Sequence, residues 1–236
     1  MSQQGSDREL AIPQVESGKR ILITGASGGL GRETMQLFAR SELWLGAHYY
    51  RNVQPLRQLI KKDQFKKSQV QLFEANLTSA EASRRLVKDF VEWAGGVDIL
   101  VQLNGGIVYP TPWNELSEEQ WNTDLALNLT APFFLAQSAI KYMQANGGKI
   151  ILTSTASAKH GGGSTSMAYG VAKAGIECLT KGLARICAPH NILVNAICPG
   201  FIDTEFHIQR MHRTAEDLRQ RANLVPLKRA GRRIFG

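Results

Sequence analysis

The chain has 236 residues, of which 43% are hydrophobic, and it carries a formal net charge of +8 at neutral pH. This length and apolar content suit one α/β domain with a substantial core, and no apolar run approaches the roughly 18 residues of a membrane span. Residues 210–236 hold eight Lys or Arg and two acids, so the positive charge is concentrated in one segment. Without interleaved aromatic residues or a recognisable motif, this charge does not indicate nucleic-acid binding.

The remaining compositional features give expectations about location and metal binding. Residues 1–18 are mostly polar and lack the apolar core of a signal peptide, which predicts a flexible N-terminal extension on a cytoplasmic protein with one domain over residues 19–236. Cys178, Cys187 and Cys198 show neither metal-binding nor CxxC spacing. We expect them to be free thiols in a reducing compartment, and we expect no metal site.

Short apolar runs alternate with helical periodicity along the chain. Strands are expected at the start of 21–31, in the central part of 43–52, and at 70–73, 98–101, 148–155 and 192–197. Helices are expected after the first glycine turn, at about 53–67, 79–93, 117–146 and 169–188, and in a helical lid at 205–224 within a substrate-covering segment 201–224. This alternation predicts a doubly wound parallel sheet with helices on both faces, in three α/β/α layers.

The stretch from Ile21 to Gly31 combines a strand, a glycine-rich turn and the start of a helix. The N–H groups of such a turn and the positive end of the helix dipole attract an anion, so the stretch predicts a pyrophosphate site. The run Gly25-Ala26-Ser27-Gly28-Gly29 also fits the G-x-S-x-G nucleophile elbow of a serine hydrolase, with Ser27 as nucleophile. That alternative needs a downstream acid and histidine, and no clear companion acid accompanies the candidates His160, His190, His207 and His212.

A second motif follows the strand at 148–155, which ends in hydroxyl-bearing residues. Tyr169 and Lys173 are four residues apart, so they share one face of a helix. Reduction of a carbonyl needs a hydride on carbon and a proton on oxygen, and a tyrosine can give that proton if a nearby ammonium lowers its pKa. A serine or threonine hydroxyl can orient the carbonyl oxygen.

These two motifs, Thr24-Gly25-x-x-x-Gly29-x-Gly31 and Tyr169-x-x-x-Lys173, resemble those of the short-chain dehydrogenase/reductase family. The resemblance covers about residues 19–229. Within the family, the sequence most resembles the 3-oxoacyl-acyl-carrier-protein reductases. It implies a Rossmann fold and an enzyme that interconverts a ketone and a secondary alcohol. It also implies a catalytic set of Asn128, Thr155, Tyr169 and Lys173, in which Asn128 follows Trp121 by seven residues and breaks its helix so that a carbonyl holds a water.

The resemblance further implies a set of residues that bind the nicotinamide dinucleotide. They are Thr24, Gly25, Ser27, Gly29, Leu30, Gly31, Arg51, Asn76, Leu77, Asn104, Gly105, Tyr169, Lys173, Pro199, Gly200, Ile202 and Thr204. Arg51 follows the second strand, where an acid would accept the ribose 2′-hydroxyl of NAD and an arginine suits a 2′-phosphate. No acid lies between Trp44 and Asn52. The sequence therefore favours NADP(H) over NAD(H).

The chain departs from the family pattern at three places. Gln102-Leu103-Asn104-Gly105-Gly106 stands where the family has Asn-Asn-Ala-Gly. The usual interval of thirteen residues from hydroxyl to tyrosine falls on Ala156; strand alignment favours Thr155 as the carbonyl-positioning residue, with Ser154 and Ser157 as alternatives. The final helix and edge strand of the family are expected to be absent.

The basic segment and the helix at 169–188 give expectations about the substrate and partners. The basic segment 210–236 favours an acidic carrier or a phosphorylated thioester among small-molecule carbonyl or alcohol substrates. In the family, the helix at 169–188 pairs across a subunit interface, which implies a homodimer or homotetramer. The strand end His48-Tyr49-Tyr50-Arg51 also resembles pteridine reductases, and a non-catalytic dinucleotide-sensing protein is a further alternative. Phe206, His207, Met211 and Leu218 are the expected lid residues around the substrate.

Overall fold

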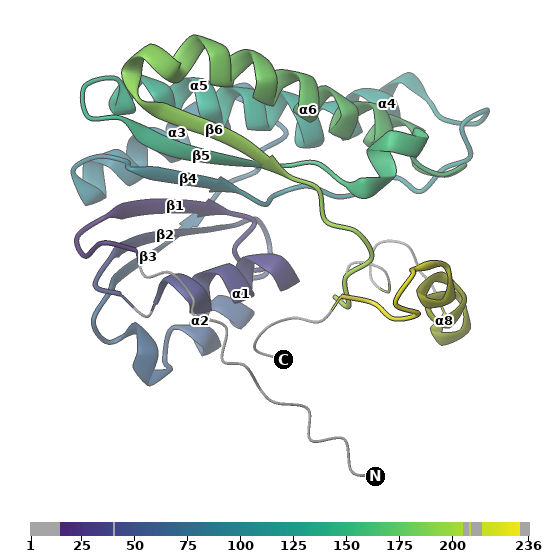
Figure 1. The fold of residues 1–236 in the computed structure, drawn as a ribbon, viewed down its shortest axis with the longest axis horizontal. Helices are drawn as coiled ribbons and strands as arrows, with labels where there is room; N and C mark the ends of the chain where they lie inside the picture. Colours follow the sequence, from purple (N-terminus) through teal and green to yellow (C-terminus); the bar gives the residue numbers. More distant parts are fainter. Residues whose placement is uncertain (1–14, 40, 205–207, 209–213, 232–236) are drawn as a thin grey trace.

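The computed structural model describes residues 15–39, 41–204, 208 and 214–231 (Figure 1). Six parallel strands form one sheet in the order β3-β2-β1-β4-β5-β6. They are β1 (Arg20–Thr24), β2 (Trp44–Tyr49), β3 (Gln69–Glu74), β4 (Ile99–Gln102), β5 (Gly148–Thr153) and β6 (Ile192–Ile197). This is the doubly wound Rossmann order expected from the sequence.

Helices cover both faces of the sheet. They are α1 (Gly29–Phe38), α2 (Gln54–Leu59), α3 (Ala80–Ala94), α4 (Glu118–Leu125), α5 (Ala131–Met143) and α6 (Met167–Cys187). A further helix, α8 (Ala215–Leu224), lies away from the sheet (Figure 1). Short helical turns are η1 (Asp63–Phe65), η2 (Ala126–Thr130), η3 (Ala156–His160) and η4 (Ala188–His190). Among the described residues, no helix is both long and apolar enough to cross a membrane.

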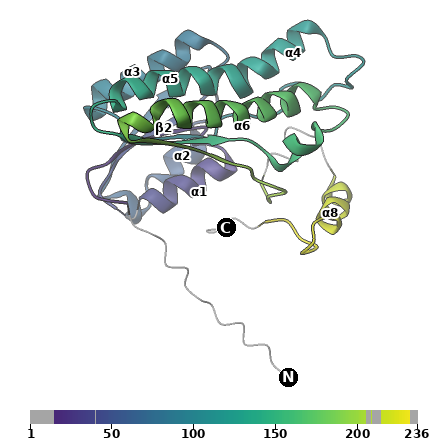
Figure 2. The ribbon, with the colours of Figure 1, turned by 45° about the horizontal axis from the view of Figure 1, so that its top comes forward.

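Side-chain alternation along the strands builds two separate cores, one on each face of the sheet. In β1, Leu22 packs into the core under α3, α5 and α6, while Ile21 and Ile23 pack into the core under α1 and α2. Figures 1 and 2 show these two helical layers on opposite sides of the sheet. At about 25 cal/mol per Å² of buried apolar area, these two cores supply the main driving force for folding.

The topology places a site at the carboxyl ends of the central strands. From the central strand β1 the chain moves outward through β2 to β3, and it then returns to the other side of β1 as β4. The connections that follow β1 and β4 therefore diverge at the carboxyl ends of these strands. Ligands of open α/β sheets bind at this switch point.

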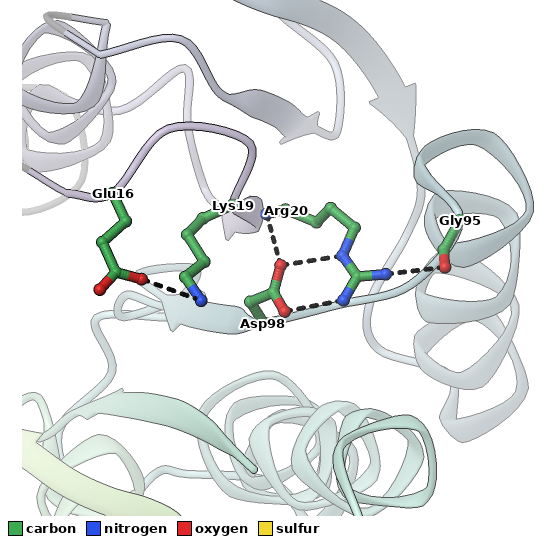
Figure 3. Close-up of polar contacts among 5 residues, drawn as sticks. All are labelled: Glu16, Lys19, Arg20, Gly95 and Asp98. Atoms are coloured by element: carbon green, nitrogen blue, oxygen red, sulfur yellow. Dashed lines mark hydrogen bonds and ion pairs between the residues drawn. The ribbon is translucent and has the colours of Figure 1, made fainter. Parts of the chain in front are cut away.

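At the amino ends of the central strands, an ion pair joins Arg20 and Asp98 (Figure 3). The Arg20 Nε and Nη2 atoms donate to the two Asp98 carboxylate oxygens at 2.8 and 2.7 Å, and the Arg20 backbone N–H donates to Oδ2 at 2.8 Å. Arg20 Nη1 also donates to the Gly95 carbonyl. This bidentate pair joins the start of β1 to the residue before β4, at the end of the strands opposite to the predicted site.

Two predicted helices differ from the structure. The helix expected over 53–67 is wrong in length, since α2 ends at Leu59 and the chain turns through η1, which buries Phe65 against the core under α1 and α2. The long helix expected over 117–146 is divided by the π-helical segment η2, which contains Asn128. The break expected at Asn128 is therefore present as a local change of helix type.

The segment after β6 leads to the chain's C-terminal part. Ile202 forms a parallel bridge with Gly231, and the Gly231 N–H donates to the Phe201 carbonyl at 2.8 Å. Helix α8 lies beside this bridge, away from the sheet (Figure 2). The predicted lid residues Phe206, His207 and Met211 lie outside the described residues, as do residues 1–14 of the predicted N-terminal extension.

Candidate active site

The glycine turn between β1 and α1 is held in a conformation that requires glycine. Gly25 has a φ of +68°, and a Cβ on it would lie 2.7 Å from the Asn104 backbone nitrogen. A Cβ on Gly31 would lie 2.6 Å from the Ala26 Cα. The turn passes so close to the segment after β4, and α1 begins so close to the turn, that neither position has room for a side chain.

The first turn of α1 fits a pyrophosphate. Its N-cap is Gly28, which provides no side-chain cap, and the first turn contains no acidic residue. The terminal N–H groups of the helix are thus left to a ligand, and the helix dipole favours an anion there. The predicted contacts Ser27, Gly29 and Leu30 lie in or beside this turn, and the Arg32 guanidinium donates to the Ser27 carbonyl at 3.2 Å.

His48 supports the glycine turn from β2. The Gly25 N–H donates to His48 Nδ1 at 3.0 Å, and His48 Nε2 lies 3.0 Å from the Ala75 carbonyl oxygen after β3, to which it donates. Burial lowers the pKa of His48 from 6.5 to about 4, so the ring is neutral at physiological pH. Sequence analysis missed this role, because only the folded sheet brings Gly25, His48 and Ala75 together.

Gln102 and Asn104, which depart from the family pattern at the end of β4, belong to a buried hydrogen-bond network. Gln102 Oε1 accepts from the Thr153 N–H at 3.1 Å, and its Nε2 donates to the Asn104 carbonyl. Asn104 Oδ1 accepts from the Thr24 hydroxyl at 2.6 Å. Gln102 therefore joins β4 to β5 while Asn104 joins β4 to β1, and the predicted contacts Thr24 and Asn104 lie together.

Lys173 is buried at the centre of the site. Its Nζ donates to the Thr153 carbonyl at 2.7 Å, and burial lowers its pKa from 10.5 to about 7. A Cβ on Gly105 would lie 3.0 Å from this Nζ and 2.8 Å from Asn128 Oδ1. The close approach of Gly105 thus brings Lys173 and Asn128 to one point.

Tyr169 lies one helical turn before Lys173 on α6, and its hydroxyl lies near that of Thr155. The Lys173 Nζ is 5.7 Å from the centre of the Tyr169 ring. Burial raises the pKa of Tyr169, the hydroxyl of Thr155 acts to lower it, and the charge of Asp124 acts to raise it. Phenol and hydroxyl thus lie together at the carboxyl edge of the sheet.

The three candidate hydroxyls after β5 differ in their surroundings. The Ser154 hydroxyl is buried, 2.9 Å from the Lys173 carbonyl oxygen and 3.0 Å from Glu177 Oε1, so it is directed at α6. The Ser157 backbone N–H donates to Thr155 Oγ1 at 3.3 Å, an interaction that caps η3. Of the three, Thr155 is the one that contacts the Tyr169 hydroxyl.

Asn128 is fully buried in the π-helical segment between α4 and α5. Its Oδ1 accepts from the Gly106 N–H at 2.9 Å, and its Nδ2 donates to the carbonyls of Gly106 and Asp124 at 2.8 and 2.9 Å. The side chain is thus committed to holding the segment after β4. This leaves the backbone at the π turn as the group that could hold a water in the expected relay.

The expected adenosine side of the site lies at the ends of β2 and β3. Arg51 is exposed, with its guanidinium 4.8 Å from the centre of the Tyr50 ring. Asn76 Oδ1 accepts from the N–H and hydroxyl of Thr78, which leaves the Asn76 amide N–H groups for a base. Leu77 is buried in the core under α3.

The remaining predicted contacts follow β6. The Pro199 carbonyl accepts from the Ala156 N–H at 3.0 Å, which places the Pro199–Gly200 turn beside Thr155 and η3. Ile202 and Thr204 lie farther along. They line a pocket of about 190 Å³ with one side of α8. The other lining residues are Phe201, Asp203, Leu218, Arg219, Ala222 and Ala230.

Sequence analysis also missed Asp124, a buried acid on α4. Its Oδ1 accepts from the Val108 N–H at 2.9 Å, and the N–H of Tyr109 lies near this carboxylate. Burial raises the pKa of Asp124, and these two N–H groups act against that rise. Its burial depends on the loop at Val108, which no local sequence pattern predicted.

Comparison with known proteins agrees with this arrangement. A family model described as short chain dehydrogenase matches residues 19–215. The chain is 31% identical over 217 residues to the 3-oxoacyl-[acyl-carrier-protein] reductase FabG of Thermotoga maritima, covering 91% of this chain and 85% of that protein. It is 32% identical over 219 residues to nodulation protein G of Azospirillum brasilense, with 92% and 86% covered.

Solved structures give the same result. A short-chain dehydrogenase/reductase from Serratia marcescens superposes with a TM-score of 0.82 at 26% identity, covering 92% of this chain and 86% of that one. A short chain dehydrogenase from Burkholderia cenocepacia in complex with NADP superposes with a TM-score of 0.81 at 26% identity, with the same coverage of both chains. The chain therefore belongs to the short-chain dehydrogenase family, a family of oxidoreductases that bind a nicotinamide dinucleotide.

Proposed function

We propose that this protein interconverts a ketone and a secondary alcohol with NADP(H), and that Tyr169 is its acid/base. The observation that carries the proposal is the cluster of Tyr169, Thr155, Lys173 and Asn128 at the carboxyl edge of the sheet, beside an uncapped helix N-terminus. These groups supply a proton donor, a second hydroxyl and a buried amine around one point. That is the set that a carbonyl oxygen needs when it receives a proton.

Each residue has a distinct proposed role. In reduction, Tyr169 gives its proton to the substrate oxygen, and Thr155 positions that oxygen with a second hydrogen bond. The chemistry that the bound nicotinamide supplies is hydride transfer to or from the carbonyl carbon. Lys173 would hold the ribose next to the nicotinamide and replenish the proton, and the backbone at Asn128 would hold a water that links Lys173 to solvent.

Substitution of Tyr169 by Phe tests the acid/base role. The ring stays in place and only the hydroxyl is lost, so we expect turnover to fall by at least about 10²-fold. Binding of NADPH, followed by its fluorescence, should persist. Full activity of Tyr169→Phe would contradict the proposed function.

Arg51 supports the preference for NADP(H), since it is exposed at the end of β2 and carries the positive charge that a 2′-phosphate needs. We expect wild-type protein to bind NADPH more tightly than NADH, and Arg51→Glu to reverse that order. Lys141→Glu is a matched control, because it makes the same charge change on the exposed surface of α5. Equal affinities for both cofactors in the wild type would remove the preference.

The proposed substrate class is a 3-oxoacyl thioester, which an acidic carrier can deliver. Four described basic residues after β6 support it: Arg219, Arg221, Lys228 and Arg229. The similarity to a 3-oxoacyl reductase agrees with this class. The double variant R219E/R221E should lose turnover with an acyl-carrier substrate, and it should keep turnover with the acetoacetyl thioester of N-acetylcysteamine, which has no carrier. Equal effects on both substrates would exclude a carrier-binding role for this segment.

We also propose that the enzyme is a homodimer or homotetramer. Val171 and Ile186 on α6 are 43% and 72% exposed, which leaves apolar surface on this helix in a single chain. Sedimentation velocity should give a mass of two or four chains. A monomer would contradict this proposal.

A further inference from the structure

Asp124 is a buried acid that the proposed chemistry does not use. It lies on α4 with only 2% of its surface exposed. An ionised carboxylate in such a place is costly unless hydrogen bonds hold it. Here the Val108 backbone N–H donates to Asp124 Oδ1 at 2.9 Å, and the nearby Tyr109 N–H also favours the carboxylate. Such bonds favour the charged form of the acid.

These bonds connect Asp124 to the active site through the segment 106–109. Asn128, one helical turn later, binds both the N–H and the carbonyl of Gly106 and also the Asp124 carbonyl. The preceding residue, Gly105, is in close approach to Lys173 Nζ and Asn128 Oδ1. Asp124 and Asn128 therefore anchor the same segment, at its far end and its near end.

Helix α4 also packs against α6, which carries Tyr169 and Lys173. Among the described residues, the charged groups near Tyr169 are Asp124 from α4 and Lys173 from its own helix. Glu177 lies one turn beyond Lys173, next to the Ser154 hydroxyl. The group contributed from the end of β5 is the uncharged Thr155. A negative charge at Asp124 makes a negative phenolate at Tyr169 less favourable, and burial strengthens that effect.

We propose that Asp124 is a positioning residue with two effects: its carboxylate fixes the segment 106–109 beside Lys173 and Asn128, and its negative charge acts on the buried Tyr169 from the helix packed against α6, in addition to the effect of burial. The proposal rests on the proposed function, in which Tyr169 is the acid/base. Protonated Tyr169 is the form that reduces a carbonyl, and ionised Tyr169 is the form that oxidises an alcohol. Asp124 therefore extends the pH range of reduction upward and moves the onset of alcohol oxidation to higher pH.

The test measures Tyr169 directly, without a substrate. The chain has five tyrosines, so ¹³Cζ-tyrosine labelling gives few NMR signals, and loss of one signal in Tyr169→Phe assigns it. In full-length protein bound to NADPH, Asp124→Asn removes the charge and keeps an oxygen that can accept from Val108. We expect the titration of Tyr169 to move to lower pH by about 0.5 to 1 unit, the scale of one charge in a partly buried site. An unchanged titration would overturn the proposal.

A matched control separates this charge from the general charge of the helix. Glu119 is exposed on α4, so Glu119→Gln removes one negative charge from the same helix without touching the site. We expect no shift in the Tyr169 titration, and a shift equal to that of Asp124→Asn would overturn the local role. If Asp124→Asn does not fold, Asp124→Ser is the second variant, since it also removes the charge and retains a hydroxyl acceptor.

Turnover distinguishes failure of this inference from failure of the proposed function. With the acetoacetyl thioester of N-acetylcysteamine as substrate, the alkaline limit of reduction by Asp124→Asn should move to lower pH in step with the NMR titration. If Tyr169→Phe stays active, the proposed function fails and this inference fails with it. If Tyr169→Phe is inactive and Asp124→Asn titrates as wild type does, only the role of Asp124 is overturned.

Discussion

Gly25 donates its backbone N–H to Nδ1 of His48 at 3.0 Å, so a side chain from β2 fixes the turn that a pyrophosphate would contact. The other ring nitrogen is bound to the carbonyl of Ala75 after β3. One buried imidazole thus ties the ends of three adjacent strands together. The relationship links the stability of the sheet edge to the shape of the cofactor turn.

Substitutions of His48 should separate these two effects. His48→Phe leaves the Gly25 N–H buried without an acceptor, so we expect a loss of about 1–3 kcal/mol in the free energy of unfolding. We also expect weaker binding of NADPH. His48→Asn places an oxygen close to the position of Nδ1 and should retain more of the NADPH affinity than His48→Phe does. Urea denaturation and fluorescence titration measure the two quantities, and equal affinities in both variants would exclude the role of the Gly25 contact.

His48 also makes a pH-dependent contribution to stability. Its pKa is about 4 in the folded protein and 6.5 for an exposed histidine, as in the unfolded chain. At a pH between these two values, the unfolded chain therefore binds more protons than the folded protein does. The stability that neutral His48 contributes is therefore present above about pH 6.5 and declines as the pH falls toward about 4. Urea denaturation across this range should show a steeper decline for the wild type than for His48→Asn. Parallel pH profiles of the two proteins would show that His48 titrates normally.

The hydroxyls of Thr155 and Ser154 should give opposite results on substitution. Thr155→Val removes the hydroxyl that contacts Tyr169, and we expect turnover to fall by about 10²-fold while NADPH binding is kept. Ser154→Ala removes a hydroxyl that is directed at α6, and we expect a loss of about 1 kcal/mol in stability with most of the activity retained. The reverse pattern would assign the carbonyl-positioning role to Ser154.

Gly105 offers a steric test of the site. Gly105→Ala places a Cβ 2.8 Å from Asn128 Oδ1 and 3.0 Å from Lys173 Nζ, so it should displace both groups. We expect kcat to fall by at least about tenfold, since small displacements of catalytic groups are costly. Gly95→Ala is the control, because Gly95 also has a positive φ, +76°, but a Cβ on it would have no neighbouring atom within 4 Å. Similar kcat values in both variants would show that the contact at Gly105 does not matter.

The ion pair between Arg20 and Asp98 predicts a loss of stability without a loss of cofactor binding. Arg20→Met leaves Asp98 without its bidentate partner, and we expect the free energy of unfolding to fall by about 1–3 kcal/mol. The exposed pair of Lys66 and Asp63 is the control, and Lys66→Met should change stability by less than about 0.5 kcal/mol. Both variants should bind NADPH as the wild type does, because both pairs lie away from the site.

Local patterns predicted the parts of this protein that depend on local physics. The apolar run Ile21, Leu22 and Ile23 predicted a buried strand, and the structure places these side chains in two cores. The spacing of Tyr169 and Lys173 predicted one helical face, and both residues lie on α6. The change of helix type at Asn128 was expected, although from the family resemblance rather than from the residues themselves.

Residues whose role depends on distant partners could not be predicted in this way. An aspartate on a helix is usually exposed, and Asp124 is buried only because the loop at Val108 folds over it. Gln102 replaces an asparagine of the family pattern, but its bonds to Thr153 and Asn104 exist only once β4 and β5 pair. The choice between Thr155 and Ser154 likewise depended on the direction in which each hydroxyl leaves the strand end.

Because of the π-helical segment Ala126–Thr130, the structure between α4 and α5 depends on the number of residues there as well as on their identity. Each residue of an α-helix advances by about 100° around the axis. One extra residue in a regular helix would therefore rotate α4 by about that angle relative to α5, whose buried side chains fix it in the core, and the π turn takes up that residue locally instead. Removing one residue here would produce a regular helix and keep the orientation of α4, but it would remove the irregular backbone at Asn128 that is proposed to hold a water. A single deletion at this junction would act on the active site while every proposed catalytic side chain remained in the sequence.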